Sequence, residues 1–134
     1  MGDEMRIRIE SDSDIVLARE HGRAIGKKVG FSATDLTIIA TAISEVARNI
    51  LEFAKSGEII LDTTEQGGRH GIVIIAEDTG PGISDISLAL QDGYSTGKGL
   101  GLGLPGVRRL MDEFQVLSES RKGTTVTMKK WLTR

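Results

Sequence analysis

The pattern of apolar and polar residues along the chain predicts a succession of short strands and longer helices. Residues 5–10, with the sequence MRIRIE, alternate apolar and charged side chains as in a half-buried strand. Residues 11–30 and 32–57 carry apolar side chains at helical spacing, and each segment begins with a capping serine and ends at a glycine. Residues 58–66 and 71–78 flank the sequence GGRH and predict an antiparallel hairpin.

A second group of elements follows a glycine-rich region. Residues 105–114 predict a helix with a proline in its first turn, and residues 115–120 and 124–131 predict a second hairpin. The run 73–76 is apolar at every position, as in a central strand buried on both faces. Hairpins need no crossovers, so this order predicts an α+β two-layer sandwich: a mixed, largely antiparallel five-stranded sheet with about three helices on one face.

Composition narrows the class of protein. The 134 residues fit a single domain spanning 1–134. A formal net charge of −2, from 17 basic and 19 acidic side chains, gives no reason to expect nucleic-acid binding. The absence of cysteine excludes disulfides and Cys-ligated metals. No apolar run approaches the roughly 20 residues of a membrane span and no signal peptide is visible, so we expect a cytoplasmic domain without membrane contact.

Two glycine-rich stretches are unusual for so small a domain. The sequence DTGPGI, residues 78–83, directly follows a predicted strand, and GKGLGLGLPG occupies residues 97–106. The second stretch is not a Walker A loop, because GYSTGKG has the wrong spacing and follows no strand. GLGLPG does not stand directly after a strand, as a dinucleotide fingerprint would, and the HRD and DFG motifs of protein kinases are absent. Two such stretches suggest that the chain binds a ligand, with a motif other than the Walker A, dinucleotide-binding and protein-kinase motifs.

Glu45 and Asn49 form a polar pair at the edge of the long predicted helix. Their i,i+4 spacing makes the two side chains neighbours beside the apolar face. A surface hydrogen bond is the ordinary explanation of such a pair. A carboxylate beside a carboxamide is also able to hold a hydrated Mg²⁺ and orient a nucleophile. The pair becomes informative when it is joined to the glycine-rich stretches.

Four short sequences now stand in order along the chain, SEVARN, DTGPG, GKGLGLG and KGTTV. Together they resemble the Bergerat-fold ATP-binding superfamily, which contains gyrase, the heat-shock chaperone ATPases, histidine kinases and MutL. The resemblance covers nearly the full chain and implies that ATP and Mg²⁺ are the cofactors. It further implies that Asn49 is a ligand of Mg²⁺ and that Glu45 is the catalytic general base.

The chemistry of the residues agrees with this resemblance. Asp78 is able to accept a hydrogen bond from the amine of adenine and disfavours the carbonyl of guanine. Glycines beside it let the backbone approach the base, and the glycines of the second stretch offer N–H groups to phosphate next to the start of a helix. Lys98 is either a charge for the outer phosphates or a solvated loop lysine. The residues expected to bind the nucleotide are Asn49, Asp78, Gly80, Gly82, Ile83, Thr96, Gly97, Lys98, Gly99, Leu100, Gly101, Gly103 and Thr124.

Within the superfamily the chain is most similar to the free-standing, anti-sigma-factor-like serine/threonine kinases, and in particular to the RsbT-type switch kinases of the bacterial stressosome. The chain is short for gyrase or the chaperones, and neither His21 nor His70 lies in a dimerising helical hairpin. The resemblance implies phosphorylation of STAS-domain partners, an RsbS-like antagonist and an RsbR-like scaffold. It also implies that the released kinase activates a PP2C-type, RsbU-like phosphatase by binding it.

Two other functions remain open at this point. The first is that of an anti-sigma factor of the same fold, whose main act is binding a sigma factor. The second is that of a non-catalytic ATP-dependent binding module. Any of the three functions requires a docking surface for a protein. Residues 14–30 lie outside the nucleotide motifs and are a candidate for it, although a solvated amphipathic helix has the same pattern.

Overall fold

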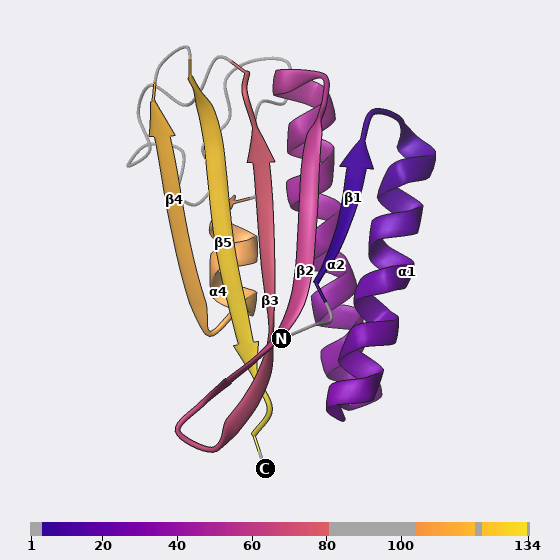
Figure 1. Cartoon of the computed structure of the whole chain (residues 1–134), viewed down its shortest axis with the longest axis vertical. Helices are drawn as coiled ribbons and strands as arrows, with labels where there is room; N and C mark the ends of the chain where they lie inside the picture. Colours follow the sequence, from indigo (N-terminus) through magenta and orange to yellow (C-terminus); the bar gives the residue numbers. More distant parts are fainter. Residues whose placement is uncertain (1–3, 81–103, 120–121, 134) are drawn as a thin grey trace.

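The computed structural model describes residues 4–80, 104–119 and 122–133. In this part of the chain five strands form one sheet in the order β1-β2-β3-β5-β4, and all four pairings are antiparallel. Figure 1 shows the helices packed on one face of this sheet, which confirms the predicted two-layer α+β architecture. The sheet is antiparallel throughout the described residues and not mixed, because each strand pairs only with antiparallel neighbours. The elements are β1 Met5–Ile9, α1 Asp12–Val29, α2 Ala33–Asn49, a π-helix η1 Ile50–Ala54, β2 Gly57–Gln66, β3 Arg69–Asp78, α4 Leu104–Leu110, β4 Glu113–Glu119 and β5 Gly123–Trp131.

Local capping explains why the first helix has the bounds that the sequence predicts. The carboxylate of Asp14 accepts hydrogen bonds from the backbone amides of Glu10, at 2.8 Å, and Ser11, at 3.1 Å, at the start of α1. Gly30 ends the helix with a φ of 111°, a left-handed conformation that favours glycine. The second helix begins as predicted after Ser32, whose hydroxyl accepts from a backbone amide of the first turn.

The end of the second helix differs from the prediction. The α-helix ends at Asn49, continues as the π-helix η1, and turns at Lys55 with a φ of 73°. Gly57 does not stop the helix, because it is already the first residue of β2. A side chain there would lie 2.8 Å from Cγ2 of Ile50, so this glycine serves the packing of η1 against the sheet.

The helix α4 is shorter than predicted. It ends at Leu110, and the following strand β4 begins at Glu113 within the segment predicted to be helical. Asp112 makes the connection: its carboxylate accepts from the backbone amide of Trp131 at 2.7 Å, and its own amide donates to the carbonyl of Lys129 at 3.0 Å. These contacts with β5 turn the chain into the sheet.

The core lies between the sheet and the helices and is almost wholly aliphatic. Gly22 brings α1 close to α2, because Cδ1 of Ile43 occupies the space of a side chain there. The opposite face of the sheet is open, so Val73 and Ile75 are only half-buried and the predicted burial of this run on both faces is wrong. No helix among the described residues is long and apolar enough to cross a membrane.

Candidate functional site

Asp78 is the last residue of the central strand β3, and two backbone amides hold its carboxylate. It is paired with Gly57 of β2 and with Thr124 of β5. Its Oδ1 accepts from the amide of Gly80 at 2.9 Å and from the amide of Thr124 at 3.3 Å. Among the described residues, Oδ2 takes part in no hydrogen bond or ion pair. The carboxylate is therefore fixed through one oxygen, while the other is available to a ligand.

Glycines are required around this carboxylate by close packing. A side chain at Gly80 would lie 2.6 Å from Cβ of Ala54 and 3.3 Å from Oδ1 of Asp78. Gly123 has a φ of 108°, and a side chain there would lie 2.7 Å from Cα of Thr79. Gly80 is one of the expected site residues. Gly123 belongs to the KGTTV sequence, but its close approach to the end of β3 appears only once the strands are paired.

A hydroxyl pair adjoins the carboxylate on β4 and β5. Ser118 is the cross-strand partner of Thr124, and its Oγ lies 2.9 Å from Oγ1 of Thr124. The Ser118 hydroxyl also donates to the carbonyl of Gly123 at 3.1 Å. Sequence reasoning identified Thr124 and missed Ser118. The register of the hairpin would have revealed it, because residues 118 and 124 are equidistant from the turn.

Glu45 and Asn49 lie one helical turn apart on α2, as predicted. Asn49 is the last α-helical residue, and the π-helix that follows carries Ala54, which packs against Gly80. Figure 1 shows this end of α2 beside the end of β3. A π-helix is uncommon and often marks a functional site. The structure thus brings the end of α2 that carries Asn49 and the end of β3 that carries Asp78 to one end of the sandwich.

The carboxylate of Glu45 opens onto a groove between α1 and α2. Its Oε2 lies 3.3 Å from the guanidinium of Arg48, and the Glu45 side chain is 37% exposed. The groove has a volume of about 260 Å³ and is rich in arginine. Its lining consists of Arg19, Arg23, Thr37, Ala40, Thr41, Ser44, Glu45 and Arg48. A hydroxyl group entering this groove would meet one carboxylate in a basic surrounding.

The other expected site residues lie outside the described part of the chain. They are Gly82, Ile83, Thr96, Gly97, Lys98, Gly99, Leu100, Gly101 and Gly103. What the structure does describe is the helix after them, which begins at Leu104 with Pro105 in its first turn, as predicted.

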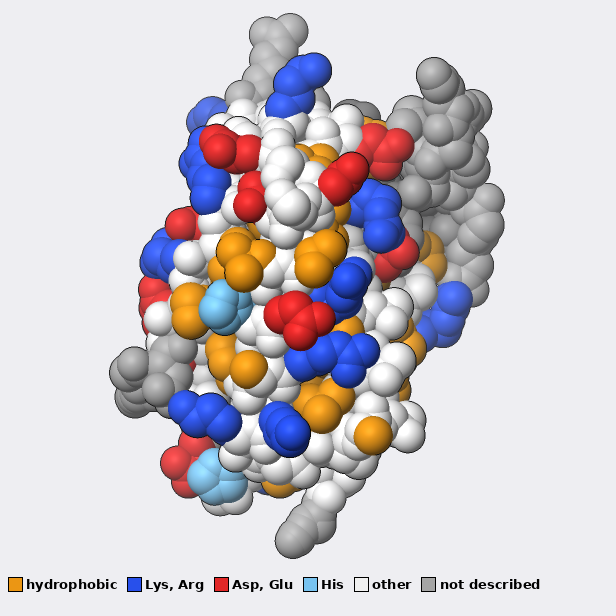
Figure 2. Space-filling view, turned by 90° about the vertical axis from the view of Figure 1, so that its right-hand side faces the viewer, with side chains coloured by type: hydrophobic (Ala, Val, Ile, Leu, Met, Phe, Trp, Pro, Cys, Tyr) orange, Lys and Arg blue, Asp and Glu red, His pale blue; other side chains and the backbone are white. Residues whose placement is uncertain are grey.

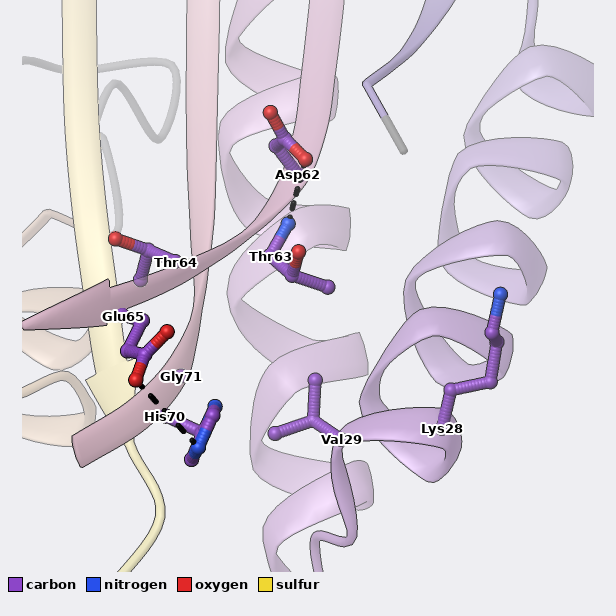
Figure 3. Close-up of a pocket in the computed structure, with 8 residues that line it drawn as sticks. All are labelled: Lys28, Val29, Asp62, Thr63, Thr64, Glu65, His70 and Gly71. Carbon is purple, nitrogen blue, oxygen red and sulfur yellow. Dashed lines mark hydrogen bonds and ion pairs between the residues drawn. The ribbon is translucent and has the colours of Figure 1, made fainter. Parts of the chain in front are cut away.

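A larger pocket, of about 840 Å³, contains none of the expected site residues. Figure 3 shows it between the end of α1 and the β2–β3 hairpin, with His70 beside Glu65. It includes Gly71, which is at the opposite end of β3 from Asp78. The side chains of His70 and Glu65 are each about 60% exposed and lie 4.0 Å apart, which is a weak contact. Within residues 4–80, 104–119 and 122–133, no three His, Asp or Glu side chains cluster as a metal site would require.

The geometry of the site agrees with the relationship of the chain to known proteins. The histidine kinase-, DNA gyrase B- and HSP90-like ATPase family matches residues 34–134, and the chain belongs to this family. It is 49% identical over 132 residues to the serine/threonine-protein kinase RsbT of Bacillus subtilis (strain 168), covering 98% of this chain and 99% of that protein. The predicted similarity to serine/threonine kinases of the RsbT type is thereby confirmed.

Anti-sigma factors are more distant relatives, and two histidine kinases of known structure share the fold. The anti-sigma F factor of Clostridium kluyveri is 34% identical over 102 residues, which is 72% of this chain and 70% of that protein. The catalytic domain of histidine kinase ThkA has a TM-score of 0.56 at 16% identity and covers 97% of this chain and 99% of its own. Full-length ShkA, in complex with AMPPNP, has a TM-score of 0.56 at 20% identity and covers 90% of this chain and 30% of its own. These structures share the fold.

Proposed function

We propose that this chain transfers the terminal phosphoryl group of ATP to a serine or threonine of a STAS-domain protein. The observation that carries the proposal is the Asp78 carboxylate, fixed through Oδ1 by the amides of Gly80 and Thr124. Oδ2 is then an acceptor for the exocyclic amine of adenine. Guanine would present a carbonyl oxygen there and leave two acceptors facing each other, which costs a factor of roughly 10 or more in affinity.

The polar pair of α2 fits a role in phosphoryl transfer. Asn49 offers a carboxamide oxygen, a hard ligand of the kind that Mg²⁺ prefers, and it is the residue that would hold the ion. Bound Mg²⁺ supplies neutralisation of phosphate charge. Glu45 accepts the proton of the attacking hydroxyl or orients that hydroxyl, and the guanidinium of Arg48 lies 3.3 Å from its carboxylate. Phosphoryl transfer needs little beyond such placement and charge.

The partners that we propose are based on the similarity of the chain to RsbT. We propose an RsbS-like antagonist and an RsbR-like scaffold as substrates, and an RsbU-like PP2C-type phosphatase that the released kinase activates by binding. The helix α1 is the candidate docking element, because Val16 and Leu17 are 45% and 48% exposed on it. Figure 2 shows the side of the molecule formed by α1, where apolar and charged side chains are interspersed. Such a mixed surface suits reversible binding.

Transfer of radiolabel from γ-labelled ATP to a purified STAS-domain protein tests the proposal. We expect labelling by the unaltered chain and its loss, by a factor of roughly 100 or more, in Asn49→Ala and Glu45→Gln. Glu52→Gln is the matched control, because Glu52 is an exposed glutamate of the neighbouring η1. Labelling that is equal in all four proteins would show that the pair of α2 has no catalytic role.

A second candidate function is binding of a sigma factor, which the similarity to anti-sigma F factors favours. A binding experiment on the immobilised chain, with ATP present, distinguishes the anti-sigma function from the switch-kinase function. Retention of an RNA polymerase sigma factor in preference to STAS-domain and phosphatase proteins would support the anti-sigma function. Retention of the STAS-domain protein, followed by its release after phosphorylation, would support the switch kinase.

A further inference from the structure

The hydroxyl of Ser118 determines how the hydroxyl of Thr124 is oriented. A serine hydroxyl has one proton to donate. Ser118 donates it to the carbonyl of Gly123, which lies at 3.1 Å and is only an acceptor. The 2.9 Å contact between the two hydroxyls must then be made with the proton of Thr124. Thr124 is left with its lone pairs for any further partner, so it acts as an acceptor.

This orientation places two acceptors side by side at the end of the sheet. Thr124 and Asp78 are directly paired across β3 and β5, so their side chains project to the same face, toward the helices. The free groups there are Oδ2 of Asp78 and the lone pairs of Thr124. An exocyclic amine with two N–H donors matches two acceptors. A carbonyl oxygen matches neither, whereas a threonine free to rotate would be able to donate to it.

We propose that Ser118 is a positioning residue for nucleotide selection. It takes the proton of Thr124, so that Thr124 and Asp78 both accept from the amine of adenine and both reject the carbonyl of guanine. The inference rests on the nucleotide site of the proposed function. It adds a residue that acts on the nucleotide through Thr124 rather than by binding it.

The test compares the dissociation constants of ATP and GTP for purified variants. In Ser118→Ala the Thr124 hydroxyl is free to turn and donate, so we expect GTP to bind more tightly relative to ATP by a factor of about 10. Ser118→Thr keeps the hydroxyl and should keep the original ratio. Thr125→Val is the matched control, because Thr125 neighbours Thr124 on β5 but projects to the opposite face. A merely structural loss would weaken both nucleotides in parallel and leave the ratio unchanged.

A double variant tests the route through Thr124. In a Thr124→Val background, which lacks the hydroxyl, Ser118→Ala should no longer change the ratio. The inference is overturned if Ser118→Ala leaves the ratio at its original value, or if it changes the ratio equally with and without the Thr124 hydroxyl. A chain that binds neither nucleotide before any substitution would overturn the proposed function, and the inference with it. Binding with an unaltered ratio in Ser118→Ala would overturn the inference alone.

Discussion

The backbone amide of Thr124 donates to Oδ1 of Asp78 at 3.3 Å, across two directly paired strands. A second amide, from Gly80, donates to the same oxygen at 2.9 Å. One carboxylate oxygen thus joins β3, β5 and the glycine-rich segment after β3. Both donors belong to the backbone, so the position of the carboxylate depends on the register of the sheet, and the chemistry of its second oxygen can be changed separately.

Asp78→Asn should therefore weaken ATP binding without unfolding the protein. The asparagine oxygen is able to accept from the same two amides, while its NH₂ group would face the amine of adenine, donor against donor. We expect ATP affinity to fall by about 1–3 kcal/mol, or roughly 5- to 150-fold. Titration calorimetry measures the affinity, and far-ultraviolet circular dichroism checks the fold. Undiminished ATP binding by this variant would remove Asp78 from the nucleotide site.

Gly123→Ala should disturb both the fold and the site. The residue has a φ of 108°, and an added Cβ would lie 2.8 Å from the carbonyl carbon of Asp78. We expect a loss of more than about 1 kcal/mol in the free energy of unfolding, together with weaker ATP binding. Gly68→Ala is the matched control, because Gly68 has a φ of 83° but open space around it. The control bears the backbone strain alone, so an equal loss in both variants would contradict a role for close packing at Gly123.

The elements predicted correctly from the sequence are those whose ends are determined locally. Asp14 and Gly30 make their capping contacts within a few residues, and such contacts are visible as sequence patterns. The early end of α4 was not predictable in this way. The carboxylate of Asp112 binds the backbone of Trp131, 19 residues away, and this contact exists only once β5 lies beside it.

The same distinction holds within the candidate site. Asp78 was predicted because an acid before a Gly-x-Gly sequence at the end of a strand is a recognisable local pattern. Ser118 was missed because a serine in a strand is unremarkable until the hairpin register sets it opposite Thr124. The π-helix was missed for a similar reason, since its form is linked to the packing of Ala54 against Gly80. A local sequence pattern was thus enough to predict Asp78, whereas the places of Ser118 and of the π-helix depend on tertiary contacts.

Gly22→Ala should destabilise the protein, although alanine is ordinarily the better helix residue. The added Cβ would collide with Cδ1 of Ile43 on α2, because the two helices approach closely there. We expect a loss of about 1–3 kcal/mol, measured by urea unfolding with the fluorescence of Trp131, the single tryptophan. Ile43→Val removes the colliding Cδ1, so the double variant should recover part of the loss. Strictly additive losses in the double variant would contradict the collision.

Lys55→Gly should stabilise the protein. Lys55 is the only non-glycine residue with positive φ in the described part of the chain, at 73°, and it joins η1 to β2. A side chain in this conformation is strained, and glycine relieves the strain at some cost in the entropy of the unfolded chain. We expect a net gain of about 0.5–1 kcal/mol, read as a higher midpoint of urea unfolding. Lys27→Gly is the matched control: it replaces an exposed lysine inside α1 and should lower stability by about 1 kcal/mol. If both substitutions lower the midpoint, Lys55 is not a point of backbone strain, and the turn after η1 is held by contacts of the lysine side chain instead.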